Sequence, residues 1–352
     1  MMLDNNFKEN AIAENYLLHI YISSKNNKHI TQYAEKLIEE IKDIYRYVEP
    51  SHLKNDFIVC IALDNQIISK KNGQNIKYDK TKLLATTSSN IIIQTMEQNL
   101  LFWTNLNKNS ILKIKNVLFY IFGKDNEYFL FNGNKTNILP NKKPHSIYSK
   151  YFLELENELN YYSINKILYS SCEIFKKTWA DEKRIYFKNK PEEEMQKSLL
   201  EHLKFTLRNQ VEFVAREYNL NAKKPVDICI RWGTANRSAL IEVKWLGVSL
   251  NKTNSKKSTE YTNSRAVDGM KQLKEYLDLI KRDAPATIIK GYLVIIDGRR
   301  KGISQKIVSV ISEEDGFYYE SKEISIPSDY NYSKTIHNFE PPIRMFARPV
   351  CQ

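Results

Sequence analysis

The chain has 352 residues, 42% of them hydrophobic, which allows two domains and excludes a disordered or fibrous protein. No apolar run reaches the roughly 20 residues of a membrane helix, and the polar start MMLDNNFKEN has no signal-peptide core, so we expect a cytoplasmic protein without membrane contact. The net charge of +12 favours an anionic partner such as nucleic acid, although a generally Lys-rich composition explains the charge equally well.

The first 140 residues alternate helical and strand patterns, and they predict a mixed α/β N-terminal domain over 1–140. Apolar spacing predicts a helix at 30–48, and an apolar run predicts a buried strand at 56–63. Residues 88–106 are predicted as a helix with Ser at its start, and 116–133 as a hairpin. No chemical motif is visible here, so target sensing, partner binding and oligomerisation all stay open as roles.

A linker separates this region from a second predicted domain. Two prolines among polar residues mark the linker, and 148–179 is predicted as one or two helices, so 141–185 is assigned to linker and bridging helices. Residues 186–352 form the second domain. It opens with a helix that begins near Pro191, has three glutamates in its first turn, and continues its pattern as far as Tyr218.

The stretch PVDICIRWGTANRSALIEVKWLG contains two apolar runs, and charged residues interrupt both of them. Alternation along a strand places Asp227 on one face of the first strand, and Glu242 and Lys244 on one face of the second. If Trp232 pairs with Ala239 across an antiparallel turn, the charged faces of the two strands coincide and Asp227 pairs with Lys244.

Two carboxylates buried together repel each other unless a positive charge lies between them. A divalent cation meets this need, and all-oxygen ligands favour Mg²⁺, with Mn²⁺ as the alternative. The four cysteines and six histidines are dispersed, so zinc is not expected. Lys244 can approach an attacking water or a phosphate oxygen. The plain alternative is a salt-bridged trio on a solvated sheet face.

The pattern of Asp227 followed by Glu242-Val243-Lys244 on adjacent strands resembles the catalytic core of the PD-(D/E)XK nuclease superfamily, which includes many restriction enzymes and RecB-type nucleases. The resemblance covers about residues 186–300. It implies an α/β fold with a C-terminal restriction-endonuclease-like core, in which helices flank a mixed central sheet. It also implies a Mg²⁺ site formed by Asp227, Glu242 and the backbone carbonyl of Val243, with Lys244 orienting the nucleophile.

Further residues fit this resemblance. Glu193, at the end of the apolar stripe of the opening helix, stands where the superfamily often has an additional catalytic acid, and Glu192 or Glu194 would replace it if the helix phase differs. An acid in a first helical turn also serves the helix dipole alone. Gln272 and Tyr276, one turn apart, are similar to the QxxxY motif of RecB-like members, where the pair contacts nucleic acid; a polar helix edge is the alternative.

The segments after the hairpin follow the order that the resemblance requires. Residues 250–267 form a polar insert, 268–282 are predicted as a helix, and 287–298 are predicted as an apolar strand that completes the central sheet. Arg299 and Arg300 come next in a basic cluster, and we expect them to contact phosphates. A solvated loop is the alternative for such a charge run.

The resemblance implies a Mg²⁺-dependent endonuclease that hydrolyses DNA phosphodiester bonds, with RNA as the alternative substrate. No Walker A pattern is present, so ATP-driven translocation would need a separate partner subunit. These features resemble nucleases of prokaryotic restriction and anti-phage defence, and cleavage of both strands would favour a homodimer. Two alternatives stay open: a recombination nuclease of the resolvase or transposon-end type, and a catalytically silent nucleic-acid-binding protein.

Overall fold

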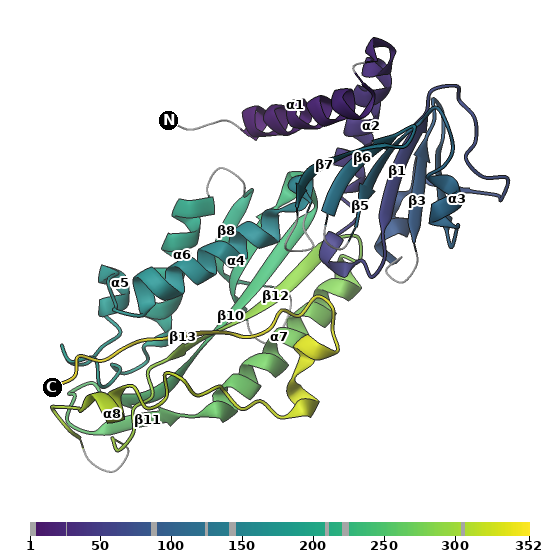
Figure 1. Ribbon diagram of the computed structural model, residues 1–352. Coiled ribbons are helices and arrows are strands. Elements are labelled where there is room, and N and C mark those ends of the chain that lie inside the picture. The colour runs from purple at the N-terminus through teal and green to yellow at the C-terminus, as the bar shows by residue number, and fades with distance from the viewer. Residues whose placement is uncertain are drawn as a thin grey trace. The chain divides into compact units, whose positions relative to one another are not determined.

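The computed structural model describes residues 5–25, 27–85, 90–123, 126–140, 146–207, 211–219, 225–303 and 307–352. The chain divides into an N-terminal unit, Met1–Tyr151 with Thr234–Asn236, and a C-terminal unit, Phe152–Gly233 with Arg237–Gln352 (Figure 1). Each unit contains a mixed sheet and helices, which confirms the mixed α/β class. Within the described ranges, no helix combines the length and apolar character needed to cross a membrane.

The N-terminal unit is built on a sheet with the strand order β2-β4-β3-β1-β5-β6-β7. Strands β1 and β3 run parallel, and the other neighbouring pairs run antiparallel. The elements of this unit are α1 (Asn5–Ser23), α2 (Thr31–Ile44), β1 (Phe57–Ala62), β2 (Gln74–Asn75), β3 (Ile91–Thr95), β4 (Leu100–Thr104), α3 (Lys108–Ile111), β5 (Val117–Phe122), β6 (Asn126–Phe131) and β7 (Asn134–Pro140).

Three of the four predicted elements in this unit are confirmed, namely the helix at α2, the buried strand at β1 and the hairpin of β5 and β6. The helix predicted over 88–106 is wrong, because this segment forms β3 and β4 joined by a tight turn. The amide of Met96 donates to the carbonyl of Asn99 at 2.9 Å in that turn. Ile and aromatic side chains fit a buried sheet, and pairing with β1 outweighs the local helical pattern.

The C-terminal unit is built on a sheet with the order β8-β9-β10-β12-β13, and β11 pairs with β10. Strands β8, β9 and β10 are antiparallel neighbours, whereas β10, β12 and β13 run parallel. The elements are α4 (Tyr151–Tyr162), α5 (Glu173–Lys176), α6 (Glu192–Leu207), β8 (Phe213–Tyr218), β9 (Val226–Trp232), β10 (Arg237–Leu250), β11 (Lys257–Tyr261), α7 (Asn263–Asp283), β12 (Ile288–Asp297), α8 (Glu313–Gly316) and β13 (Ile343–Phe346).

Helices cover both faces of this second sheet, so β10 is buried along its whole length. Helix α7 packs along β10 and β12, as Figure 1 shows. On the other face, Phe152 of α4 packs edge-on against Trp232 of β9, with ring centroids 5.6 Å apart. A strand buried on both faces is normally apolar throughout, so any charge on it needs a specific partner.

Two predictions about this unit need correction. The opening helix ends at Leu207, and residues 213–218, predicted as its continuation, form β8, because they pair with β9 in the sheet. The register of the hairpin is also different: Trp232 pairs with Arg237 and not with Ala239. Gly233–Ala235 forms a short 3-10 turn, so β10 begins earlier than predicted. A shift of two residues leaves every side chain on its predicted face.

Gly269 of α7 lies directly against the sheet. A Cβ atom there would come within 2.6 Å of Leu293 Cδ1 and 2.9 Å of Lys244 Cγ. We expect Gly269→Ala to lower the free energy of unfolding by about 1–2 kcal/mol, because the overpacking exceeds the gain of about 1 kcal/mol in helix propensity. Urea unfolding measures the change. Glu275→Ala, at an exposed position of the same helix, should change stability by less than about 0.5 kcal/mol, and equal midpoints for both variants would contradict the close packing.

Candidate active site

Strands β9 and β10 bring two carboxylates together inside the C-terminal unit. The ladder between these strands ends at Ile241 and Ile228, and Glu242 and Asp227 are the next residues beyond its end. The backbone amide of Val243 donates to Asp227 Oδ2 at 2.7 Å. The Asp227 side chain therefore occupies the position at which a backbone carbonyl of β9 would otherwise continue the ladder.

Burial excludes a solvated sheet face as the explanation of these charges. Asp227 is 9% exposed, Lys244 is 2% exposed and Glu242 is fully buried. Charged groups are almost never buried to this degree unless they are paired or bind a metal. The face that carries the trio is therefore not solvated, although Lys244 and Glu242 do form a salt bridge.

Lys244 lies between the acids of this site. Its Nζ atom donates to Glu242 Oε1 and lies 3.4 Å from Glu192 Oε1. Burial alone lowers the pKa of Lys244, but the negative charges of Glu242, Asp227 and Glu192 outweigh it and hold the pKa above its ordinary value. The ammonium group therefore stays charged at neutral pH.

The acid that helix α6 adds to the site is Glu192 and not Glu193. Besides approaching Lys244, Glu192 accepts from the guanidinium of Arg265 at 3.1 Å. Glu193 has a side chain that is 61% exposed and pairs with Lys197 at 3.0 Å and with Arg216 at 3.7 Å. Glu193 therefore lies outside the group formed by Asp227, Glu242 and Lys244. Glu192, the alternative expected if the helix phase differs, takes its place.

The two buried carboxylates have raised pKa values. Burial raises the pKa of Asp227 to about 6, against the opposing effect of the Lys244 charge. Burial, together with the charge of Asp227, raises the pKa of Glu242 to about 8. The Oε2 atom of Glu242 is buried and has no hydrogen-bond partner among the described residues. This pair thus has less positive charge and fewer donors around it than two ionised carboxylates require.

A divalent cation would supply the positive charge that these two carboxylates lack. Hard oxygen donors suit Mg²⁺, and the unpartnered Oε2 of Glu242 faces no competing protein donor among the described residues. The N–H and C=O of one strand residue point toward the same neighbouring strand, so the Val243 carbonyl points toward Asp227, beyond the end of the ladder. No three His, Cys, Asp or Glu side chains of the described ranges gather into a metal site, so Asp227, Glu242 and Val243 would share an ion with water.

Gln272 and Tyr276 of α7 connect this helix to the start of β9. Gln272 Nε2 donates to the Tyr276 hydroxyl at 2.6 Å, and that hydroxyl donates to the carbonyl of Pro225 at 2.9 Å. Tyr276 is 1% exposed, and burial raises the pKa of its hydroxyl. The pair is one turn apart, as the motif predicts, and it fixes the backbone two residues before Asp227.

The two arginines predicted to contact phosphates have different environments. Arg299 donates through Nε and Nη2 to the buried Asp297 and through Nη1 to Asn263 at 2.7 Å. Arg300 is 4% exposed, and its Nη2 atom donates to the backbone carbonyls of Arg184 and Ala347. Burial lowers the pKa of Arg300 to about 9. We therefore leave Arg300 out of the proposed phosphate contacts.

Arg265 is the site residue that the sequence reasoning did not single out. Arg265 falls in the predicted polar insert, which ends at residue 267, whereas α7 begins at Asn263. Thr262 is the N-cap of this helix, and Arg265 and Gly269 are four residues apart on one helical face. With Thr262 as the helix start, Arg265 lies one turn before Gly269, the position at which an added Cβ would meet Lys244.

We compared the chain with models of protein families, with curated proteins and with solved structures, and none of the three comparisons found a match.

Mg²⁺ binding should depend on pH through the two raised pKa values. These carboxyl groups lose their protons near pH 4 in the unfolded chain, but only at about pH 6 (Asp227) and about pH 8 (Glu242) in the folded protein. Without metal, the free energy of unfolding therefore falls as the pH rises from about 4 to about 8. Metal ligands must be ionised. Saturating MgCl₂ should therefore raise the Tm only slightly at about pH 5 and clearly at about pH 8, as measured by differential scanning fluorimetry.

Glu242→Gln should abolish this increase in Tm at both pH values, because it removes the ligand with the unpartnered oxygen. Asp278→Asn, on the exposed side of α7, should retain it. An increase that is the same at both pH values, or that survives in Glu242→Gln, would contradict a metal site at this pair.

Proposed function

We propose that the C-terminal unit is a Mg²⁺-dependent nuclease domain of the PD-(D/E)XK type, and that the protein is an endonuclease that hydrolyses DNA. The observation that carries this proposal is the buried pair of Asp227 and Glu242 beside Lys244, with one carboxylate oxygen left unpartnered. The element order α6-β8-β9-β10-β11-α7-β12, with β10 parallel to β12, supports it, because it contains a helix, a hairpin, a helix and a strand in the order of the superfamily.

The side chains of the site have distinct tasks in this mechanism. Asp227, Glu242 and the Val243 carbonyl would hold the ion. Bound Mg²⁺ supplies Lewis-acid polarisation of the scissile phosphate and lowers the pKa of a water ligand. Lys244, which stays protonated, orients the attacking water and offsets negative charge on the phosphoryl oxygens. Glu192 positions both Lys244 and Arg265 through its two carboxylate contacts.

The reaction is a hydrolysis in which the water oxygen forms a bond to phosphorus and the bond from phosphorus to the 3′ oxygen breaks. The water gives up one proton to solvent, and the 3′ oxygen takes one up. The products are a 5′-phosphate and a 3′-hydroxyl, as the family resemblance implies. Arg265, whose side chain is 23% exposed and pairs with Glu192, places a guanidinium beside the site that can donate to a phosphate oxygen next to the scissile bond.

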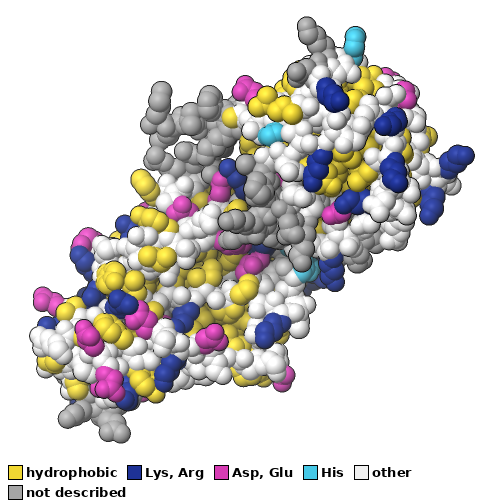
Figure 2. All heavy atoms as spheres, viewed as in Figure 1, with side chains coloured by type: hydrophobic (Ala, Val, Ile, Leu, Met, Phe, Trp, Pro, Cys, Tyr) yellow, Lys and Arg dark blue, Asp and Glu magenta, His cyan; other side chains and the backbone are white. Residues whose placement is uncertain are grey.

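The charge of the molecule is compatible with a polyanionic substrate. The net charge is +12, but on the face of the C-terminal unit in Figure 2 the Lys and Arg side chains are interspersed with acidic and hydrophobic ones. Local contacts near the site therefore matter more than one broad basic surface. We propose Gln272, Arg265 and Arg299 as such contacts, with DNA as the substrate and RNA as the alternative.

The proposed biological setting follows the resemblance. We assign the protein to a prokaryotic restriction or anti-phage defence system in the cytoplasm. The N-terminal unit would sense a target, bind a partner subunit or form a homodimer. The competing proposal of a silent nucleic-acid-binding protein draws on the ion pair of Lys244 with Glu242, because this contact neutralises the acid without any metal.

Plasmid cleavage decides between the enzyme and the silent binder. With Mg²⁺ the wild type should nick or linearise supercoiled plasmid, and EDTA should stop the reaction. Lys244→Ala should lower the rate by about a hundredfold or more, because it removes the charge that stabilises the phosphoryl oxygens. Gel electrophoresis over a time course gives these rates, and circular dichroism checks that the variant is folded.

Lys274→Ala is the matched control, because Lys274 lies on the exposed side of α7 in an ion pair with Asp278. It should cleave at the wild-type rate. Equal rates for Lys244→Ala and the wild type would sink the mechanism, and so would a wild type that cleaves no DNA or RNA at all. Faster cleavage of branched than of linear substrates would favour the recombination nuclease over a general endonuclease.

A further inference from the structure

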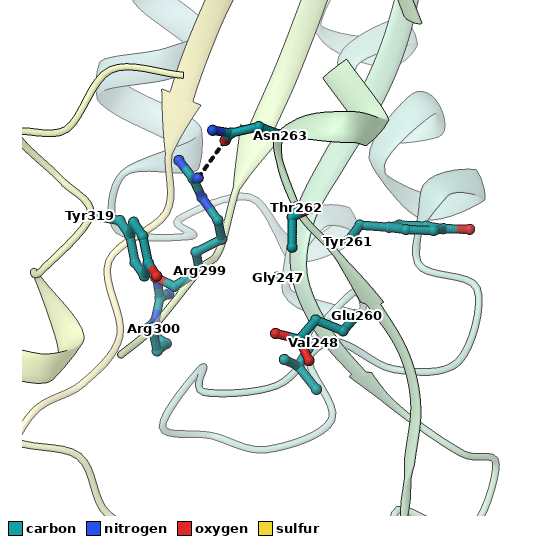
Figure 3. A pocket seen from close by; sticks show the side chains of 9 residues that line it. All are labelled: Gly247, Val248, Glu260, Tyr261, Thr262, Asn263, Arg299, Arg300 and Tyr319. Atoms are coloured by element: carbon teal, nitrogen blue, oxygen red, sulfur yellow. Dashed lines mark hydrogen bonds between the residues drawn. The ribbon is translucent and has the colours of Figure 1, made fainter. Parts of the chain in front are cut away.

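A pocket of about 310 Å³ lies at the end of β10, beyond the candidate active site. Nine residues line it, and they come from the hairpin of β10 and β11, from the start of α7 and from the segments that follow β12 (Figure 3). Arg299, Arg300 and Tyr319 form one wall in this view, and Val248, Glu260 and Thr262 lie opposite. The two walls differ in chemistry, because one is cationic and aromatic and the other contains a single charged residue, the acid Glu260.

The cationic wall carries more positive charge than its carboxylate neutralises. Arg299 and Arg344 both donate to Asp297, through contacts of 2.9 Å and 2.7 Å, so one acid serves two guanidinium groups. Arg300 donates to backbone carbonyls and lies over the rings of Trp179 and Phe346, so it holds the wall together and is not among the groups that we expect to bind the phosphate. Opposite these arginines, Glu260 is paired with Lys257 at 3.0 Å. This imbalance favours an anionic ligand.

Tyr319 and Arg299 form a stacked pair in the same wall. The ring of Tyr319 lies under the guanidinium of Arg299, 4.6 Å from the centroid to Cζ, and Figure 3 shows the two side chains next to each other. Aromatic rings and arginine planes are the surfaces on which proteins stack unpaired bases. A phosphate and a flat ring are the two parts of a nucleotide, so the wall matches one nucleotide in both charge and shape.

The volume of the pocket limits what can enter. About 310 Å³ is at the lower end of the range for small-ligand sites, which suits a single nucleotide and is too small for a stacked duplex. The exposed N-cap residue Thr262 lies at the mouth, where the first amides of the long helix α7 also favour negative charge. A base can reach this wall only when it is unpaired.

The pocket is linked to the active site by side-chain contacts. Arg265, which pairs with Glu192, also lies over the ring of Tyr261 at 4.8 Å, and Tyr261 belongs to the pocket lining. Along β10, Gly247 at the pocket is three residues beyond Lys244, a distance of about 10 Å in a strand. A strand bound at Lys244 can therefore extend into the pocket.

We infer that this pocket binds one unpaired nucleotide of the strand that the active site cuts, with its base against the stacked pair of Arg299 and Tyr319 and its phosphate near the same guanidinium. The inference rests on the proposed nuclease function, and it narrows the substrate to nucleic acid that has single-stranded segments, such as overhangs, loops or displaced strands. Blunt, fully paired DNA leaves the pocket unfilled.

The test measures binding without cleavage. Fluorescence anisotropy in EDTA compares the full-length protein on a short labelled single strand, as DNA and as RNA, with the blunt DNA duplex of the same sequence. Tyr319→Ala should weaken binding of single strands about tenfold, as expected for loss of one base stack, and change duplex binding by less than about twofold. Tyr78→Ala, at an exposed tyrosine of the N-terminal unit, is the matched control and should change neither.

A second pair of variants keeps the test valid if Tyr319→Ala does not fold. Thr262→Glu should also weaken single-strand binding, because it adds a negative charge at the mouth while an acid at a helix start is well tolerated. Thr262→Gln should bind as the wild type does. The pocket assignment is overturned if Tyr319→Ala and Thr262→Glu bind single strands as the wild type does, or if they weaken duplex binding equally.

The two proposals fail in different ways. Binding of single strands that depends on Tyr319, in a protein that cuts nothing with Mg²⁺, would refute the nuclease and support the pocket. Cleavage that depends on Lys244, with single-strand binding that is unaffected by Tyr319→Ala, would support the nuclease and refute the pocket. A preference for the DNA or the RNA strand identifies which sugar the pocket accepts.

Discussion

The repulsion between Asp227 and Glu242 is the constraint on which the C-terminal unit depends. The two carboxylates lie just beyond the end of the ladder between β9 and β10, buried on both sides by helices. Such a pair is unfavourable in any fold that does not supply positive charge, and burial raises both pKa values. Lys244 supplies one charge and leaves one oxygen of Glu242 without a partner among the described residues. A divalent cation would supply the positive charge that the pair still lacks.

The helices around Asp227 and Glu242 position the residues that contact this pair. Helix α6 directs Glu192 toward Lys244, and α7 approaches β10 closely enough, through Gly269, to cover the stem of that lysine. Tyr276 of the same helix fixes the backbone next to β9. The first turn of α7 then connects the site, through Arg265, to a pocket with an excess of positive charge. Metal binding, phosphate binding and strand positioning can thus share one helix and two strands.

The sequence predicts the centre of this site better than its edges. Strand alternation has a period of two, so Asp227, Glu242 and Lys244 share a face even though the predicted register was shifted by two residues. In a helix, by contrast, an error of one residue turns a different side chain toward the site. The sequence predicts Glu193 as the site residue, whereas Glu192 is the one that approaches Lys244. Strands β3, β4 and β8 depend on pairing with distant strands, which local patterns do not contain. The burial that distinguishes Arg299 from Arg300 likewise depends on distant backbone carbonyls.

Direct metal binding tests the central claim most simply. Mn²⁺ substitutes for Mg²⁺ at oxygen sites, and electron paramagnetic resonance distinguishes free from bound Mn²⁺ during a titration. We predict that the wild type and Glu193→Gln bind the ion with equal affinity, that Asp227→Asn binds it far more weakly, and that Mg²⁺ displaces it. Equal Mn²⁺ binding by Asp227→Asn and the wild type, or no binding by either, would contradict a metal centre at the buried pair.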